Sequence, residues 1–123
     1  MLEEVKELAK HKEEKMVTEV DRLLGSKELD NADRRNLQVL RKYLGIYLAT
    51  YKKGMKATLA VKTAVVRSVR NLKTNEDLHN TFNKEFEELD MLLRAIHIGM
   101  FPVGTIGYEK VQKVLEENCG ALV

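Results

Sequence analysis

The sequence has little of the residues that staple, kink or anchor a polypeptide chain. Its 123 residues include one cysteine, one proline and no tryptophan, and aromatic residues make up only 6%. The lone Cys119 cannot form an intramolecular disulfide, and no cysteine cluster is present to hold zinc. A disulfide-stapled scaffold and a zinc module are therefore excluded, and a reducing compartment is expected.

Long apolar runs are also missing. Nowhere do about 18 apolar residues follow one another, so we expect no membrane-spanning helix and no membrane partner. The first residues, Met1-Leu2-Glu3-Glu4, are acidic and lack the apolar core of a secretory signal. We therefore expect a cytoplasmic protein with a single helical domain over residues 1–123, a length that supports one modest core.

Apolar residues recur at helical spacing along most of the chain. The pattern predicts helices over residues 2–24, 75–98 and 106–118, with more helix between residues 32 and 73. Asp30 or Asn31 offers a cap for the central helix. Ala, Leu, Lys and Glu dominate and no segment alternates with period two for long, so we predict an all-α bundle of four to five helices.

The charges are sorted along the chain. Residues 1–30 carry six Lys/Arg against nine Asp/Glu, and residues 74–123 carry four against nine. Residues 31–73 carry eleven Lys/Arg against a single acid, Asp33. The formal net charge of +2 thus hides a strongly basic middle, which is expected to attract polyanions or acidic surfaces.

Most basic residues of the middle segment form a stripe on one face of the predicted helix, at about 100° per residue, which Lys62 and Lys73 do not join. Nine of them are candidate binding residues: Arg34, Arg35, Arg41, Lys42, Lys52, Lys53, Lys56, Arg67 and Arg70. Gln38, Gly45 and Ala49 occupy the middle of this basic stripe, where small side chains would let a phosphate backbone approach closely.

The opposite face of the middle segment is apolar. The inward positions are Leu37, Leu40, Tyr43, Leu44, Ile46, Tyr47, Leu48, Tyr51, Met55, Leu59, Val61, Val65, Val66, Val69 and Leu72. The three tyrosines at i, i+4 and i+8 resemble a base-stacking ladder. They lie opposite the basic stripe, however, so we interpret them as core aromatics whose hydroxyls reach a boundary.

Whether residues 32–73 form one helix or two stays open. The apolar positions keep their phase through Gly54, and no proline or good N-cap marks a break, which favours one helix of about 60 Å. Glycine is unfavourable inside a helix, which favours a break near Gly54. The apolar arc of residues 37–72 spans up to about 200°, wider than one packing face needs. We therefore expect a homodimer through the middle of the chain, an expectation that a continuous helix strengthens. If the chain folds back at Gly54, the two halves can cover each other and a monomer is the alternative.

No constellation of catalytic or metal-binding residues stands out. Glu76 and His79 have the spacing found in di-iron bundles, but such sites need a second pair, which is absent. The loop from Gly99 to Gly107 lacks the Gly-Lys-Ser/Thr ending of a phosphate-binding loop. Cys119 is interpreted as a packed thiol, and Lys12, inside an apolar stripe, is expected to snorkel outward. We expect no enzyme, no metal and no cofactor.

Two functions fit this pattern. The first is a small non-enzymatic accessory or regulatory protein that binds nucleic acid, DNA or RNA, through phosphate contacts along the basic stripe. The alternative is a helical protein–protein interaction module, such as an adaptor, inhibitor or complex subunit, that docks an acidic partner. A third interpretation is a solvated basic face, partly neutralised by the acidic helices at either end of the chain.

Overall fold

The described residues fold into a small bundle of five helices. They are α1 (Leu2–Leu24), α2 (Asn31–Lys52), α3 (Leu59–Arg70), α4 (Glu76–Ile98) and α5 (Ile106–Glu117). The computed structural model describes residues 1–72 and 76–118, with the side chains of residues 76–78 outside that description. No strand occurs in the described residues, so the all-α prediction is confirmed.

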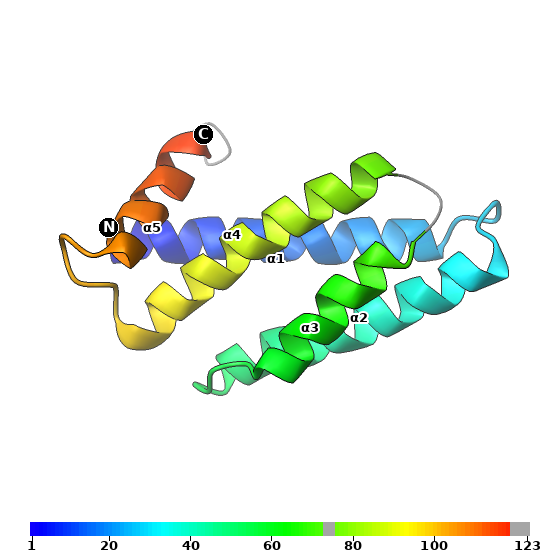
Figure 1. Ribbon diagram of the computed structural model, residues 1–123, viewed down its shortest axis with the longest axis horizontal. Coiled ribbons are helices and arrows are strands. Elements are labelled where there is room, and N and C mark those ends of the chain that lie inside the picture. Colours follow the sequence, from blue (N-terminus) through cyan, green and yellow to red (C-terminus); the bar gives the residue numbers. More distant parts are fainter. Residues whose placement is uncertain (73–75, 119–123) are drawn as a thin grey trace.

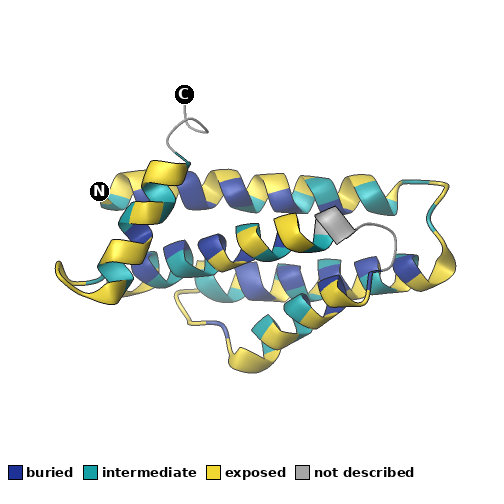
Figure 2. Ribbon diagram, turned by 45° about the horizontal axis from the view of Figure 1, so that its top comes forward, coloured by how far each residue is buried: buried dark blue, intermediate teal, exposed yellow. Residues whose placement is uncertain are grey.

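The helices are arranged around the long pair formed by α1 and α4, which pack along each other (Figure 1). Helices α2 and α3 form an antiparallel hairpin on one side of this pair. The short α5 contacts α4 and α1 near the N-terminal end of the chain. The faces of the helices that turn toward one another are the buried ones (Figure 2).

The core consists of the apolar stripes that the sequence pattern indicates. Leu8 of α1, Leu44 of α2, Val65 of α3 and Leu89 of α4 are completely buried. Tyr47 is buried as well, and its hydroxyl donates a hydrogen bond to Asp90 Oδ1 at 2.7 Å. The interpretation of Tyr47 as a core aromatic with a hydroxyl at a boundary is therefore confirmed.

The break between α2 and α3 lies at Gly54. This residue has φ +80°, and its N–H donates to Tyr51 O at 2.9 Å while Met55 N–H donates to Thr50 O at 3.1 Å. These two bonds close the end of a helix in the Schellman arrangement. Thr58 then caps α3 by accepting from Val61 N–H at 3.3 Å, a cap to which the sequence pattern gave no weight.

A single helix over residues 32–73 is therefore wrong, and the two-helix alternative is confirmed. The hairpin lets α3 bury Val65 and Val69 against the rest of the bundle, and Leu72, just after α3, is buried as well. Most of the apolar arc is thereby covered within one chain. A long helix with an uncovered apolar face therefore no longer supports the expectation of a homodimer.

Three residues expected in that arc are instead exposed, namely Ile46, Met55 and Leu59. Ile46 lies on the outer face of α2, while Met55 and Leu59 lie in and just after the connection that the break creates. A helix that ends at Lys52 no longer fixes the direction of residue 55, so the helical phase assumed from the sequence fails there.

Candidate functional site

The nine candidate cations divide into two groups in the structure, and the first group is used by the fold. Arg34 donates from Nη1 to Leu24 O and from Nη2 to Ser26 O, each at 2.9 Å. These carbonyls lie at and just beyond the C-terminal end of α1, where a cation is favourable. Arg34 therefore fastens the start of α2 to the end of α1.

Two further cations pair with acids of α1. Arg41 Nε lies 3.0 Å from Asp21 Oδ1, and Lys52 Nζ lies 3.0 Å from Glu13 Oε1. Exposed pairs of this kind contribute little stability, about 0–1 kcal/mol each. Each pair also reduces the positive charge on the edge of α2 that faces α1.

The second group remains on the surface. Its six members are Arg35, Lys42, Lys53, Lys56, Arg67 and Arg70, and all are exposed. Within the described chain no hydrogen bond or ion pair engages these side chains; Lys42 Nζ lies 5.7 Å from the centre of the Tyr43 ring. Asp33, the single acid of residues 31–73, is buried. We call these six residues the exposed cation set.

The outer face of α2 combines three of these cations with apolar side chains. Arg35, Val39, Lys42, Ile46, Ala49 and Lys53 follow one another at alternating steps of four and three residues, and all are exposed. Residues at such steps lie on one line along a helix. From Arg35 to Lys53 this line is about 27 Å long. The sequence pattern did not reveal it because Ile46 was placed in the core.

The small residues of the basic stripe have different surroundings. Ala49 is exposed on the outer face of α2. A Cβ atom added to Gly45 would lie 3.5 Å from Arg41 Nη1, so the Arg41 side chain already lies over this glycine. Close approach of a phosphate backbone is therefore open beside Ala49 and partly covered at Gly45.

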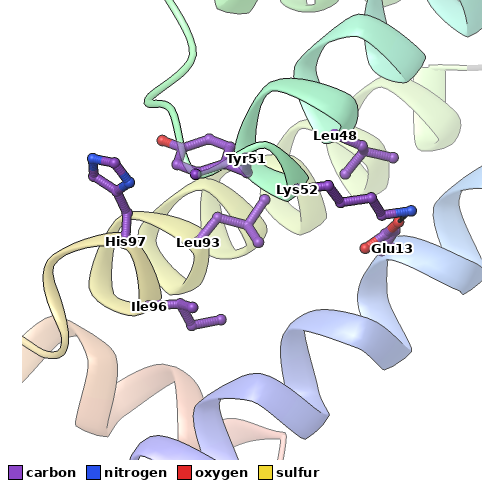
Figure 3. Close-up of a pocket in the computed structure, with 8 residues that line it drawn as sticks. Glu13, Leu48, Tyr51, Lys52, Leu93, Ile96 and His97 are labelled. Carbon is purple, nitrogen blue, oxygen red and sulfur yellow. Dashed lines mark ion pairs between the residues drawn. The ribbon is translucent and has the colours of Figure 1, made fainter.

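A cleft of about 300 Å³ opens between α1, α2 and α4 (Figure 3). Leu48, Leu93 and Ile96 supply its apolar lining. The paired side chains of Lys52 and Glu13 close one side of the cleft.

The other side of this cleft is aromatic. The Tyr51 and His97 rings lie edge to face there, with centroids 6.1 Å apart. Burial, followed by the charge of Asp90, raises the pKa of Tyr51 to about 12, so its hydroxyl stays protonated at neutral pH.

Lys12 does not snorkel outward as expected, because its side chain is buried at 2% exposure. Its Nζ lies 2.7 Å from Glu85 Oε2 and 2.6 Å from Glu88 Oε2, and it donates to Asn118 Oδ1 at 3.1 Å. The cluster joins α1, α4 and the end of α5. Carboxylates surround the amine on the interior side of the bundle, so its role is structural.

The candidate metal and thiol residues are only partly visible. A ring nitrogen of His79 bonds the Leu72 carbonyl oxygen. The side chain of Glu76 and all of Cys119 lie outside the described residues. Among the side chains that are described, no three of the metal-ligating types converge.

Comparison with protein-family models, with curated proteins and with solved structures found no match. In the part of the chain that the structure describes, every helix is too short or too polar to cross a membrane.

Proposed function

We propose that this protein is a small non-enzymatic accessory or regulatory protein that binds nucleic acid through the exposed cation set. One observation supports the proposal above the others. Arg34, Arg41 and Lys52 are engaged by the fold, whereas six cations of residues 31–73 remain exposed without a hydrogen bond or ion pair within the described chain, and Asp33 is buried. Cations so placed can neutralise phosphates and release the condensed counterions of a nucleic acid.

The spacing of the cations suits a phosphate backbone. Along the α2 axis Arg35 and Lys42 are about 10 Å apart, and Lys42 and Lys53 about 16 Å apart. Long flexible side chains can reach separate phosphates of one backbone over such intervals. Phosphate contacts orient a protein on nucleic acid but carry no sequence information. Binding with little sequence preference is therefore expected, to DNA or to RNA.

The test is a salt titration of binding to labelled duplex DNA, single-stranded DNA and RNA. Arg35→Gln with Lys42→Gln should weaken binding and flatten the slope of log K against log salt by about 0.9 for each duplex phosphate that the variant no longer neutralises. Lys6→Gln with Arg22→Gln is the matched control, because it also removes two cations but from the exposed surface of α1.

The control variant should keep the wild-type slope. Undetectable binding at low salt contradicts the proposal. So does an equal weakening in the two double variants, because a general charge effect would then account for the result.

The outer face of α2 favours a second candidate function, docking of an acidic protein helix. Val39 and Ile46 are seven residues apart and exposed between the cations. Their apolar side chains would contribute nothing to phosphate binding. An amphipathic partner helix with flanking acids could bury both while pairing with Arg35 and Lys42. Val39→Ser with Ile46→Ser separates the two functions, because it should abolish capture of a designed acidic amphipathic peptide and leave nucleic-acid binding unchanged.

A further inference from the structure

The connection between α4 and α5 displays aliphatic side chains to solvent. Residues 95–108 contain no Asp, Glu, Lys or Arg, although a third of the whole chain is charged. Within this segment Val103, Ile106 and Ile98 are 81%, 72% and 54% exposed. Single exposed apolar residues are common on protein surfaces, but three together on an uncharged connection are not.

This exposure follows from an ordered conformation of the connection. The Phe101 ring packs so closely on Gly107 that a Cβ added there would lie 2.7 Å from it. Thr105 caps α5 and also donates from Oγ1 to Pro102 O at 2.6 Å. The connection thus tucks its aromatic residue inward and holds the smaller aliphatic residues outward.

The connection between α2 and α3 displays the same combination beside lysines. Leu59 and Met55 are 79% and 55% exposed. Lys53 and Lys56 are exposed beside them, and residues 52–60 contain no acid. Among the large apolar residues of the described chain, the five with the greatest exposure all belong to these two connections and the adjoining helix ends.

The two connections lie at the same end of the bundle (Figure 1). Tyr51 and His97, each close to its own connection, have ring centroids 6.1 Å apart. We call this set the apolar end: Met55, Leu59, Ile98, Val103 and Ile106, with Lys53 and Lys56.

We propose that the apolar end binds the surface of a membrane that contains anionic lipid. Its aliphatic side chains would enter the boundary between headgroups and acyl chains, while Lys53 and Lys56 lie among the phosphates. Such contact needs no spanning helix. The absence of long apolar runs in the sequence excludes spanning segments only. The proposal therefore replaces the expectation that the protein has no membrane partner.

A lipid surface suits the apolar end better than a second copy of the chain. Protein interfaces are enriched in aromatic residues, whereas Phe101 is turned inward here and aliphatic tips are displayed. A two-fold contact through this end would also bring Lys53 and Lys56 of both copies together, with no acid in residues 52–60 to separate them.

Sedimentation with phosphatidylcholine vesicles, with and without phosphatidylserine, tests this inference. The protein should bind the anionic vesicles, and Val103→Ser with Ile106→Ser should lower the partition coefficient at least about tenfold. Lys53→Gln should lower it about fivefold on anionic vesicles and leave the neutral ones unaffected. Val39→Ser with Ile46→Ser is the matched control, because it removes two exposed aliphatic residues from the outer face of α2 and should bind as wild type.

The inference is overturned if the protein does not bind anionic vesicles, or if the Val103/Ile106 variant binds them as wild type does. Loss of self-association in that variant, without vesicle binding by the wild type, would identify a second copy as the partner. The nucleic-acid affinity of the Val103/Ile106 variant should be unchanged, so the two proposals can fail separately.

Discussion

The ammonium nitrogen of Lys12 on α1 lies 2.6 Å from Oε2 of Glu88 on α4, with both side chains buried. Glu85 and Asn118 complete the surroundings of the ammonium group. A buried charge is tolerated only when partners replace its water. The cluster is therefore satisfied only when α1, α4 and the end of α5 have come together, and it ties their relative position to the folded state.

Lys12→Met should strongly destabilise the protein. The variant keeps the packed stem but leaves the buried carboxylate of Glu88 and the half-buried carboxylate of Glu85 without their cation, which costs about 3–5 kcal/mol of unfolding free energy. Urea denaturation monitored by circular dichroism measures the loss. Lys52→Met is the control, because the Lys52 side chain is exposed and its pair with the half-buried Glu13 should contribute no more than about 1 kcal/mol. Similar losses in the two variants would contradict a structural role for Lys12.

Stability should fall at alkaline pH because of two tyrosines. Burial, followed by the charge of Asp90, raises the pKa of Tyr51 from 10.0 to about 12. Burial and then Asp90 raise the pKa of Tyr47 further. Below pH 10 both states keep these protons, so the contribution to stability is fully present there. As pH rises from 10 to about 12, the tyrosines of the unfolded chain lose their protons before those of the folded protein do. The free energy of unfolding therefore decreases over this range.

Urea denaturation between neutral pH and about pH 11 measures this dependence. The variant that combines Tyr47→Phe with Tyr51→Phe should show a flatter fall in stability over the same range, although it is less stable at neutral pH. An equally steep fall in the variant would show that other groups cause it.

Alanine should stabilise the protein at position 45 and destabilise it at position 54, where glycine now stands in both cases. Gly54 has φ +80°, so Gly54→Ala strains the end of α2 and should cost about 1 kcal/mol or more. Gly45 is helical, and its added Cβ would meet only Arg41 Nη1 at 3.5 Å, so Gly45→Ala should stabilise by about 0.5–1 kcal/mol. Thermal melts of the two variants give the comparison, and a raised melting temperature for Gly54→Ala would contradict the helix break.

The homodimer expected from the sequence remains a prediction. The apolar residues that the middle of the chain leaves exposed along α2 are Val39 and Ile46, flanked by Arg35 and Lys42. Pairing through this face brings like charges together, so salt should strengthen it by screening them. Light scattering should show a mass approaching twice 14.1 kDa as salt is raised. A mass of 14.1 kDa at every salt and protein concentration rules the dimer out.

Much of the fold follows from local sequence signals. The extents predicted for residues 2–24 and 106–118 agree with α1 and α5 to within a residue. Asp30 caps α2, accepting from Asp33 N–H at 2.8 Å, as one of the two predicted caps. Helical period and capping depend on residues only a few positions apart, so a single sequence contains them in full.

Local sequence signals did not decide whether the helix breaks at Gly54. The apolar phase through this glycine is consistent with one helix or with two, because it describes side-chain direction and says nothing of where the chain turns back. The hairpin becomes favourable when α3 can bury Val65 and Val69 against α2 and α4, which is a gain from packing.

By itself the sequence determined the helical class, the helix ends at α1 and α5, and the concentration of positive charge in residues 31–73. Only the tertiary structure decided which cations remain exposed, where the Lys12 ammonium lies, and which apolar residues gather at one end. The physical reason is distance along the chain. Arg41 meets Asp21 across 20 residues and Lys12 meets Glu85 across 73, so each pairing depends on which helices become neighbours.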